Sequence, residues 1–233
     1  MRTAFLYARV FLRNLLRYGL VRRNPSRGLL IVIDGGEGAG KDHQIERLKE
    51  KYPDAVYSRE PGGSEYAEEI RRVMLESPHA RDASGRTQLL LVSAGRSDHQ
   101  EKTIDPAILT GRNVLSNRGV CTTWGYQIGG QQGGYALKKA FFQVFDLIFA
   151  RREPDLYIIM EVDPEEGARR VALRKGKPNH YDERRRDFHL RVMESYHTFA
   201  RLYPFRVKFV DANKSKDEVF QRIDAIVGPL LRR

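Results

Sequence analysis

The chain has 233 residues, a formal net charge of +11 and 41% hydrophobic residues, a composition typical of one globular domain or of one domain with an appendage. It contains no run of about 18 apolar residues, which excludes a conventional membrane-spanning helix. A single cysteine, Cys121, excludes a disulfide framework and a cysteine-based zinc site. The six histidines show no spacing typical of metal ligands.

The positive charge is concentrated at the N-terminus, where the first 27 residues hold seven arginines and no acidic residue. Three of them, Arg9, Arg13 and Arg17, are spaced by four and would line one face of a helix. Another face of this helix is largely apolar and contains Phe5, Ala8, Leu12, Leu15 and Leu16. Gly19, Asn24 and Pro25 are expected to end the helix.

Three interpretations of this segment remain open. An arginine-rich stretch without acids is typical of a mitochondrial targeting sequence. The same pattern suits a helix that docks on a protein partner or on an anionic membrane, and a helix packed on its own domain is the third alternative. We expect residues 1–27 to be a basic targeting or docking helix, residues 28–233 to form the main domain, and the location to be mitochondrial or otherwise cytoplasmic. Nucleic acid is not an expected partner, because the charge lies in one arm and no recognition motif accompanies it.

In the main domain, short apolar runs alternate with amphipathic stretches. Strands are predicted over 29–33, 55–58, 113–116, 156–162 and 206–210. Helices are predicted over 43–52, 65–75, 87–109 (as one or two), 136–152, 164–175, 181–203 and 215–231. This order predicts an α/β fold, with a five-stranded, mostly parallel sheet that carries helices on both faces.

A glycine-rich loop follows the first predicted strand. Residues 35–42 read GGEGAGKD, which fits the phosphate-loop pattern G-x-x-x-x-G-K with an aspartate after the lysine. The glycines allow backbone N–H groups to converge on phosphate oxygens, and the lysine would bridge the β- and γ-phosphates. The sequence therefore predicts a P-loop NTPase fold whose nucleotide-binding residues are Gly35, Glu37, Gly38, Ala39, Gly40, Lys41 and Asp42.

Further motifs give the chain, from about 28 to 231, a resemblance to the thymidylate kinase family. The motifs that resemble the family's, in the same order, are GGEGAGKD (35–42), SREPGG (58–63), RTQLLL (86–91), SAGR (93–96), NRG (117–119), YQ (126–127), PDL (154–156) and DPE (163–165). The resemblance implies transfer of the ATP γ-phosphoryl group to a deoxynucleoside monophosphate, with Mg²⁺ as cofactor.

The resemblance also implies roles for individual residues. Lys41, Arg96 and Arg118 would be catalytic, and Mg²⁺ would be held near Asp42 and Glu37. The residues that would bind the acceptor nucleotide are Arg59, Glu60, Arg96, Arg118, Tyr126 and Gln127.

Several positions depart from the family pattern, and they fall on the chemistry. Asp42 stands where the family has Ser or Thr, and Asn117 stands where it has Asp. Gly119 replaces an aromatic residue, and Val92 replaces a phenylalanine that stacks on the base. The family's catalytic arginine lies beside the P-loop lysine or in the lid after Y-Q, whereas Asp42 and residues 128–134 contain none, and Lys138 and Lys139 are the nearby cations. Loss of one such charge typically lowers the rate by about 10³-fold or more.

Two functional hypotheses follow. In the first, the chain has an eroded catalytic site and serves as an accessory or structural subunit of a membrane-associated, mitochondrial assembly, on which its N-terminal helix docks. This hypothesis is compatible with retained nucleotide binding. In the second, it is an active nucleoside monophosphate kinase that acts on dTMP or a related nucleotide.

Overall fold

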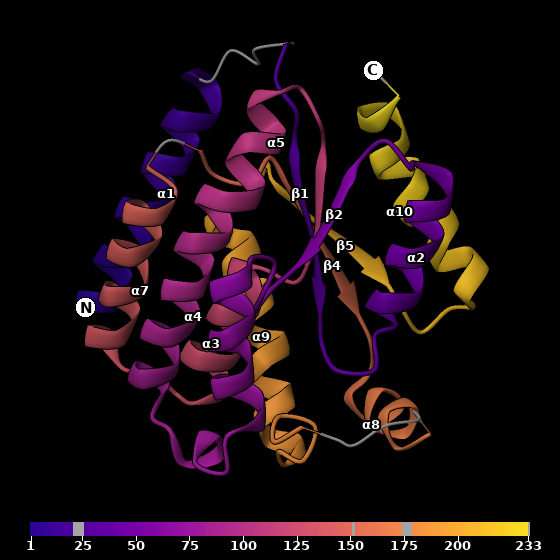
Figure 1. The fold of residues 1–233 in the computed structure, drawn as a ribbon. Coiled ribbons are helices and arrows are strands. Elements are labelled where there is room, and N and C mark those ends of the chain that lie inside the picture. The colour runs from indigo at the N-terminus through magenta and orange to yellow at the C-terminus, as the bar shows by residue number, and fades with distance from the viewer. Residues whose placement is uncertain (21–25, 151, 174–178, 233) are drawn as a thin grey trace.

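The chain forms a doubly covered parallel sheet in a computed structural model that describes residues 1–20, 26–150, 152–173 and 179–232 (Figure 1). The strands are β1 (Leu30–Gly35), β2 (Val56–Arg59), β3 (Val114–Asn117), β4 (Leu156–Glu161) and β5 (Val207–Asp211). Their order across the sheet is β2-β3-β1-β4-β5, and every paired neighbour is parallel. The predicted five-stranded α/β fold is confirmed.

Helices connect the strands. The described α-helices are α1 (Arg2–Leu20), α2 (Lys41–Lys51), α3 (Glu65–Glu76), α4 (Gly85–His99), α5 (Asp105–Leu109), α6 (Val120–Thr123), α7 (Tyr135–Ile148), α8 (Pro164–Ala172), α9 (Arg186–Leu202) and α10 (Lys216–Leu231). A 3₁₀ turn, η1 (Ala80–Asp82), and two π-helical segments, η2 (Gln100–Ile104) and η3 (Trp124–Gly130), complete the described elements.

The two faces of the central strand β1 contact different sets of helices. Ile31 and Ile33 belong to a core with α2 and α10, whereas Leu30 and Val32 belong to a larger core with α1, α7, α9 and η3. In Figure 1, α2 and α10 accordingly lie on one side of the sheet and α1, α4, α7 and α9 on the other. Because β1 is buried along its whole length, its aliphatic run needs no polar face.

Helix α1 packs on the main domain through one face only. Val10 and Asn14 are buried, Tyr7 meets the Trp124 ring edge-on at 5.9 Å, and the Asn14 amide donates to the Leu202 carbonyl at 2.8 Å. Arg13 forms an ion pair with Asp146 of α7. This face of α1 therefore packs on the chain's own domain, which is the third of the arrangements that the sequence left open.

The apolar stripe expected on α1 faces away from the domain. Phe5 is 72% exposed and Leu16 is 64% exposed, and Leu12 and Leu15 are also exposed. The arginine face instead turns partly toward the body, because Arg13 finds a carboxylate on α7. The expected helix end at Asn24 and Pro25 lies outside the described residues.

Two predicted boundaries are wrong. The helix predicted over 181–203 begins at Arg186, because the Asn179 side-chain oxygen accepts the Tyr181 N–H at 2.8 Å and holds the preceding residues in a turn. The helix predicted over 136–152 ends at Ile148. The end of the helix predicted over 164–175 falls partly outside the described residues, and α8 ends at Ala172.

Candidate active site

The glycine-rich loop lies between β1 and α2, as the pattern predicts. Gly38 and Gly40 adopt positive φ angles of 73° and 85°, and Gly40 directly precedes the first residue of α2. A Cβ on Gly38 would lie 2.2 Å from the Gly167 carbonyl oxygen, so the loop backbone touches α8 closely. Glycine is therefore required where the loop turns and where α8 approaches.

Lys41 is buried inside this loop. Its Nζ donates to the carbonyl oxygens of Gly35 at 3.1 Å and Gly36 at 2.7 Å. Burial, together with the nearby Arg118 charge, lowers the pKa of Lys41 to about 8. A phosphate group that approached the loop would offer this ammonium a stronger partner than two carbonyls.

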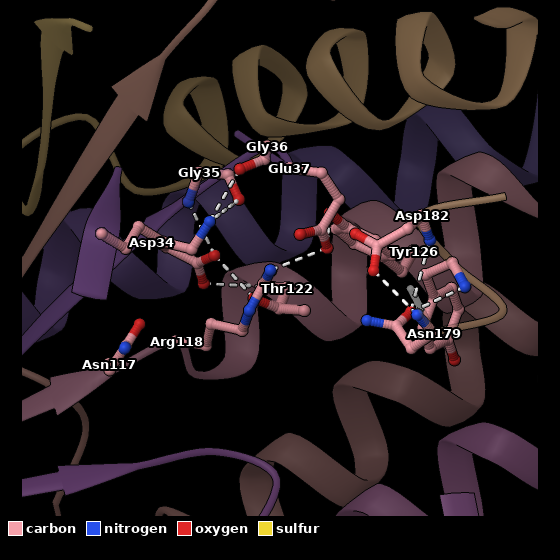
Figure 2. Close-up of polar contacts among 12 residues, drawn as sticks. Asp34, Gly35, Gly36, Glu37, Asn117, Arg118, Thr122, Tyr126, Asn179 and Asp182 are labelled. Carbon is pink, nitrogen blue, oxygen red and sulfur yellow. Dashed lines mark hydrogen bonds and ion pairs between the residues drawn. The ribbon is translucent and has the colours of Figure 1, made fainter. Parts of the chain in front are cut away.

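Arg118 and Tyr126 converge on Glu37, the third residue of the loop. Arg118 Nη2 lies 2.7 Å from Glu37 Oε1, and the Tyr126 hydroxyl donates to the same oxygen at 2.8 Å (Figure 2). Burial alone would raise the pKa of Glu37, but the charges of Arg118 and Lys41 lower it to about 2. Arg118 itself has a φ of 69°, a strained value for a residue with a side chain. Glu37 thus holds an arginine and a tyrosine at the edge of the phosphate loop.

Asp34 is a buried residue of the site that the sequence analysis missed. Its carboxylate accepts from Thr122 N at 2.8 Å, Thr122 Oγ1 at 2.6 Å and the Tyr196 hydroxyl at 3.0 Å. It therefore ties the end of β1 to α6 and α9. The only signal in the sequence was a carboxylate placed directly before the first loop glycine.

The two substituted positions at the metal side of the site touch each other. Asn117, the last residue of β3, donates from Nδ2 to Asp42 Oδ1 at 2.6 Å. Asp42 is exposed in the first turn of α2. The adjacent register of β1 and β3, with Ile33 opposite Asn117, brings the end of β3 to the loop.

These residues fit a nucleotide-bound Mg²⁺. Among the described residues, no group of three His, Cys, Asp or Glu side chains is placed to hold a metal ion. Mg²⁺ at a phosphate site takes one or two carboxylates, and its other ligands are phosphate oxygens and waters. Asp42 offers one carboxylate, and Asn117 Oδ1 is buried without a hydrogen-bond partner. Glu37 as a second Mg²⁺ residue stays a prediction, because its Oε1 is occupied by Arg118 and Tyr126.

Glu60 and Arg96 form a buried ion pair. Arg96 Nε donates to Glu60 Oε2 at 2.7 Å, and Arg96 Nη2 donates to Thr123 Oγ1 at 2.8 Å. Burial alone would raise the pKa of Glu60, but the Arg96 charge and His99 hold it below its usual value. Both residues line the cavity, and their contact with an acceptor nucleotide stays a prediction.

Two further arginines face the same cavity. Arg59 pairs with Glu68 through Nη2 at 3.0 Å and is largely exposed, whereas Arg71 donates to the Pro61 carbonyl at 2.8 Å. Burial and the charge of Arg59 lower the pKa of Arg71. Arg71 was not predicted as a site residue, although it lines the cavity from α3, six residues after the start of that helix. Like charges gathered beside a cavity indicate an anion site.

Arginines from α8 lie on the other side of the loop. Arg169 and Arg170 both line the cavity, and Arg170 Nη1 donates to the Ala212 carbonyl at 2.8 Å and lies 3.5 Å from the Gly38 carbonyl oxygen. Both are paired with Glu166. The family pattern has its arginine beside Lys41 or in residues 128–134, and the arginines of α8 were not predicted from the sequence.

Residues 128–134 are not among the residues that line the cavity around the phosphate loop. Arg191 of α9 donates to the Gly130 carbonyl, with Nη2 at 3.0 Å, so this glycine-rich run packs against a helix. Lys138 lies 5.9 Å above the Tyr7 ring, on the α1 side of the domain. It does not occupy the place of a missing arginine at the phosphate loop.

All the predicted nucleotide and acceptor residues from Glu37 on meet around one cleft of about 1280 Å³. The exception is Gly35, which contributes its carbonyl to Lys41 from behind the loop. Single drug-sized ligands occupy about 300–1,000 Å³, so this cleft has room for two nucleotides. Val92, at the position expected to contact the base, also lines it.

A parallel sheet with a glycine loop, a loop lysine and arginines around one cleft defines a P-loop nucleotide-binding protein. The thymidylate kinase family model matches residues 33–223. The thymidylate kinase of Ruegeria pomeroyi is 36% identical over 210 residues, covering 88% of this chain and 97% of that protein. The thymidylate kinase of Halalkalibacterium halodurans is 35% identical over 202 residues, covering 83% of this chain and 93% of that protein.

Solved structures agree with these sequence matches. The crystal structure of thymidylate kinase from Ehrlichia chaffeensis superimposes with a TM-score of 0.66 at 25% identity, covering 87% of this chain and 99% of that one. The chain belongs to the thymidylate kinase family. The division into residues 1–27 and 28–233 stays a prediction, and the family match begins within β1.

Proposed function

We propose that this chain is an active nucleoside monophosphate kinase that transfers the ATP γ-phosphoryl group to dTMP or a related nucleotide. One observation carries the proposal. The Lys41 loop and the arginines at 59, 71 and 118 line the same cleft, so a donor and an acceptor phosphate can meet there. Membership of the thymidylate kinase family supports it.

The chain's own residues position and neutralise the reacting phosphates. The loop amides and Lys41 would bind the donor phosphates, and Arg59 and Arg71 the acceptor phosphate. Arg118 is held by Glu37, its charge interacts with both Lys41 and Arg71, and it would stabilise charge on the transferred group. Mg²⁺, when bound, neutralises phosphate charge. An acceptor phosphate oxygen attacks the γ-phosphorus and ADP leaves, with no covalent enzyme step.

The substituted positions are compatible with activity. The site keeps a carboxylate beside the phosphate loop through Asp42, and α8 supplies arginines that the expected places lack. On this proposal, the remaining departures at Val92 and Gly119, which also line the cleft, would alter the choice of acceptor.

An acceptor panel tests the proposal. The purified full-length chain is mixed with ATP, Mg²⁺ and each deoxynucleoside monophosphate, and ADP release is measured. We expect turnover with at least one pyrimidine monophosphate and its loss in Lys41→Ala. Lys214→Ala, which removes a lysine from the rim of the same cleft, is the matched control and should retain most activity. No turnover with any acceptor would contradict the proposal.

The accessory-subunit hypothesis is the second candidate, and the exposed apolar stripe of α1 favours it. We infer that this stripe docks on an anionic lipid surface. The neighbouring arginines and the absence of acids in residues 1–27 match such a surface in charge, and Phe5, Leu12 and Leu16 are exposed for insertion. No helix among the described residues is long and apolar enough to cross a membrane.

Vesicle sedimentation tests this docking. The full chain should bind vesicles rich in phosphatidylglycerol and release them at high salt, and Leu12→Ser with Leu16→Ser should abolish binding. Leu109→Ser, an exposed leucine at the end of α5, is the control. Equal binding by both variants, or self-association through the stripe, would overturn the inference. The mitochondrial location stays a prediction that a fluorescent fusion to residues 1–27 tests.

A further inference from the structure

The contact between Asp42 and Asn117 joins two positions that depart from the family pattern. The pattern has a hydroxyl at position 42 and a carboxylate at position 117, whereas this chain has a carboxylate at 42 and an amide at 117. Both arrangements place one carboxylate at this edge of the site. Two unrelated losses would not be expected to leave the two side chains in direct contact at 2.6 Å.

We propose that Asp42 and Asn117 are an exchanged pair, in which Asp42 supplies the carboxylate for the nucleotide-bound divalent cation and Asn117 positions it. The proposal rests on the proposed function, because it concerns the metal that accompanies the donor nucleotide. On this proposal the two substitutions compensate each other, because the carboxylate lost at position 117 is replaced by the one gained at position 42.

The hydrogen bond has only one chemically sensible direction. A carboxylate only accepts, so the Asn117 amide must turn Nδ2 toward Asp42 Oδ1, which leaves its own Oδ1 pointing elsewhere. That oxygen is buried and has no hydrogen-bond partner. Oxygen is the ligand atom that Mg²⁺ and its bound waters seek. Asn117 thus orients the Asp42 carboxylate at this edge of the cleft, while its own amide oxygen stays buried and unsatisfied beside it.

Charge explains why the exchange must involve both positions. An aspartate at 117 beside Asp42 would place two carboxylates at hydrogen-bond distance, where like charges resist joint ionisation. They would also repel the donor phosphates. A serine at 42 beside Asn117 would leave the edge without a carboxylate. Either single change is therefore unfavourable, and the two together are compatible.

A double-mutant cycle tests the pair. The variants are Asp42→Ser, Asn117→Asp and the double variant, which restores the family pattern. The probe is Mn²⁺ with a non-hydrolysable ATP analogue, and electron paramagnetic resonance measures free Mn²⁺. Calorimetry measures analogue affinity with and without Mg²⁺. Asp187→Ser removes a first-turn helix carboxylate of α9 that pairs with Arg191, and it serves as the matched control.

We expect Asp42→Ser to weaken Mn²⁺ binding in the complex by about 10–100-fold, the range seen when metal-orienting groups are lost. Asn117→Asp should weaken metal-free analogue binding by about tenfold, which corresponds to about 1.4 kcal/mol. The double variant should bind Mn²⁺ and the ATP analogue with affinities within about threefold of the wild type, so that the effects of the two changes are strongly non-additive. The thermal midpoint without ligand reports whether each variant folds.

The exchanged-pair proposal would be overturned if the double variant lost Mn²⁺ and analogue affinity by the sum of the two single losses. Unchanged Mn²⁺ binding in Asp42→Ser would also overturn it. These outcomes separate it from the proposed function. Metal-dependent analogue binding with the predicted cycle but without turnover would overturn the kinase proposal and leave the pair. Turnover that persists while Asp42→Ser binds Mn²⁺ normally would overturn the pair alone. A chain that binds no analogue overturns both.

Discussion

At the scale of single residues, the arginines of the site are held in place by ion pairs with glutamates. Glu37 holds Arg118, and Glu60 holds Arg96 with side-chain exposures of 7% and 3%. Removing one partner of such a buried pair leaves an uncompensated charge. The arginines of the cleft are thus oriented before any nucleotide arrives.

Glu60→Gln should lower the free energy of unfolding at pH 7 by about 3–5 kcal/mol, because it leaves Arg96 buried and unpaired. The folded-state pKa of Glu60 is lowered, so its stabilisation is present above the unfolded value of about 4.3 and is lost as the pH falls through the lower folded value. The gap between wild type and variant should therefore shrink below about pH 4.

Urea unfolding across pH measures this gap. Glu183→Gln, which removes one partner of an exposed pair with Arg81, is the control and should cost about 1 kcal/mol or less. A variant as stable as the wild type at pH 7 would show that the buried pair does not support the fold.

Single residues also show what the sequence could predict. Lys41, the loop glycines and the arginines at 59, 96 and 118 were found because a motif fixes their place along the chain. Asp34, Arg71 and the α8 arginines were missed, since their meeting depends on how distant elements pack. The contact of Asn117 with Asp42 joins residues 75 apart, and no local pattern encodes it.

At the scale of elements, β1 and β4 were found because they read as continuous aliphatic runs, which few other structures accommodate. The start of α9 was missed because one asparagine side chain bends the backbone ahead of it. The periodicity of the sequence could not predict which face of α1 packs on the domain, because apolar residues occupy both faces of that helix. Contacts with Trp124 and Leu202 decide which face is buried.

The two faces of α1 should respond differently to truncation. Val10→Ala should destabilise the chain by about 2 kcal/mol, because Val10 is 3% exposed in the core with α7 and α9. Leu12→Ala, on the outer face, should change stability by about 0.5 kcal/mol or less. Chemical denaturation of both variants measures the difference, and equal costs would show that α1 is seated otherwise.

The glycine-rich run after the YQ motif should matter for packing against α9. A Cβ on Gly130 would lie 2.4 Å from the Phe188 ring, so Gly130→Ala should cost about 1–3 kcal/mol through overpacking. Gly134→Ala is the control, because nothing lies within 4 Å of its Cβ position. Thermal unfolding of both variants measures the contrast, and an unaffected Gly130→Ala would mean that this run does not press on α9.

At the scale of the whole molecule, the net charge divides into two parts. Residues 1–27 carry +7 of the total +11, and α1 within them turns an apolar stripe outward. In the main domain, six of the described arginines line the cleft. The proposed function assigns separate donor and acceptor sites to this cleft, so it predicts that each ligand stabilises the fold independently.

A non-hydrolysable ATP analogue at 100 times its Kd should add about 2.7 kcal/mol to the unfolding free energy, and dTMP at 100 times its own Kd should add about the same. Lys41→Ala should lose the first increment at that analogue concentration and keep the second, because the proposed function gives this lysine a role in binding the donor alone. Thermal shift measurements with each ligand alone test this. Loss of both increments would contradict two separate sites.

The most direct test of the central claim is ³¹P nuclear magnetic resonance of the full-length chain with ATP, Mg²⁺ and dTMP. Phosphoryl transfer predicts that signals of ADP and dTDP grow in equal amounts while those of ATP and dTMP decline together. Unchanged spectra, or ADP accompanied only by inorganic phosphate, would contradict a working kinase site.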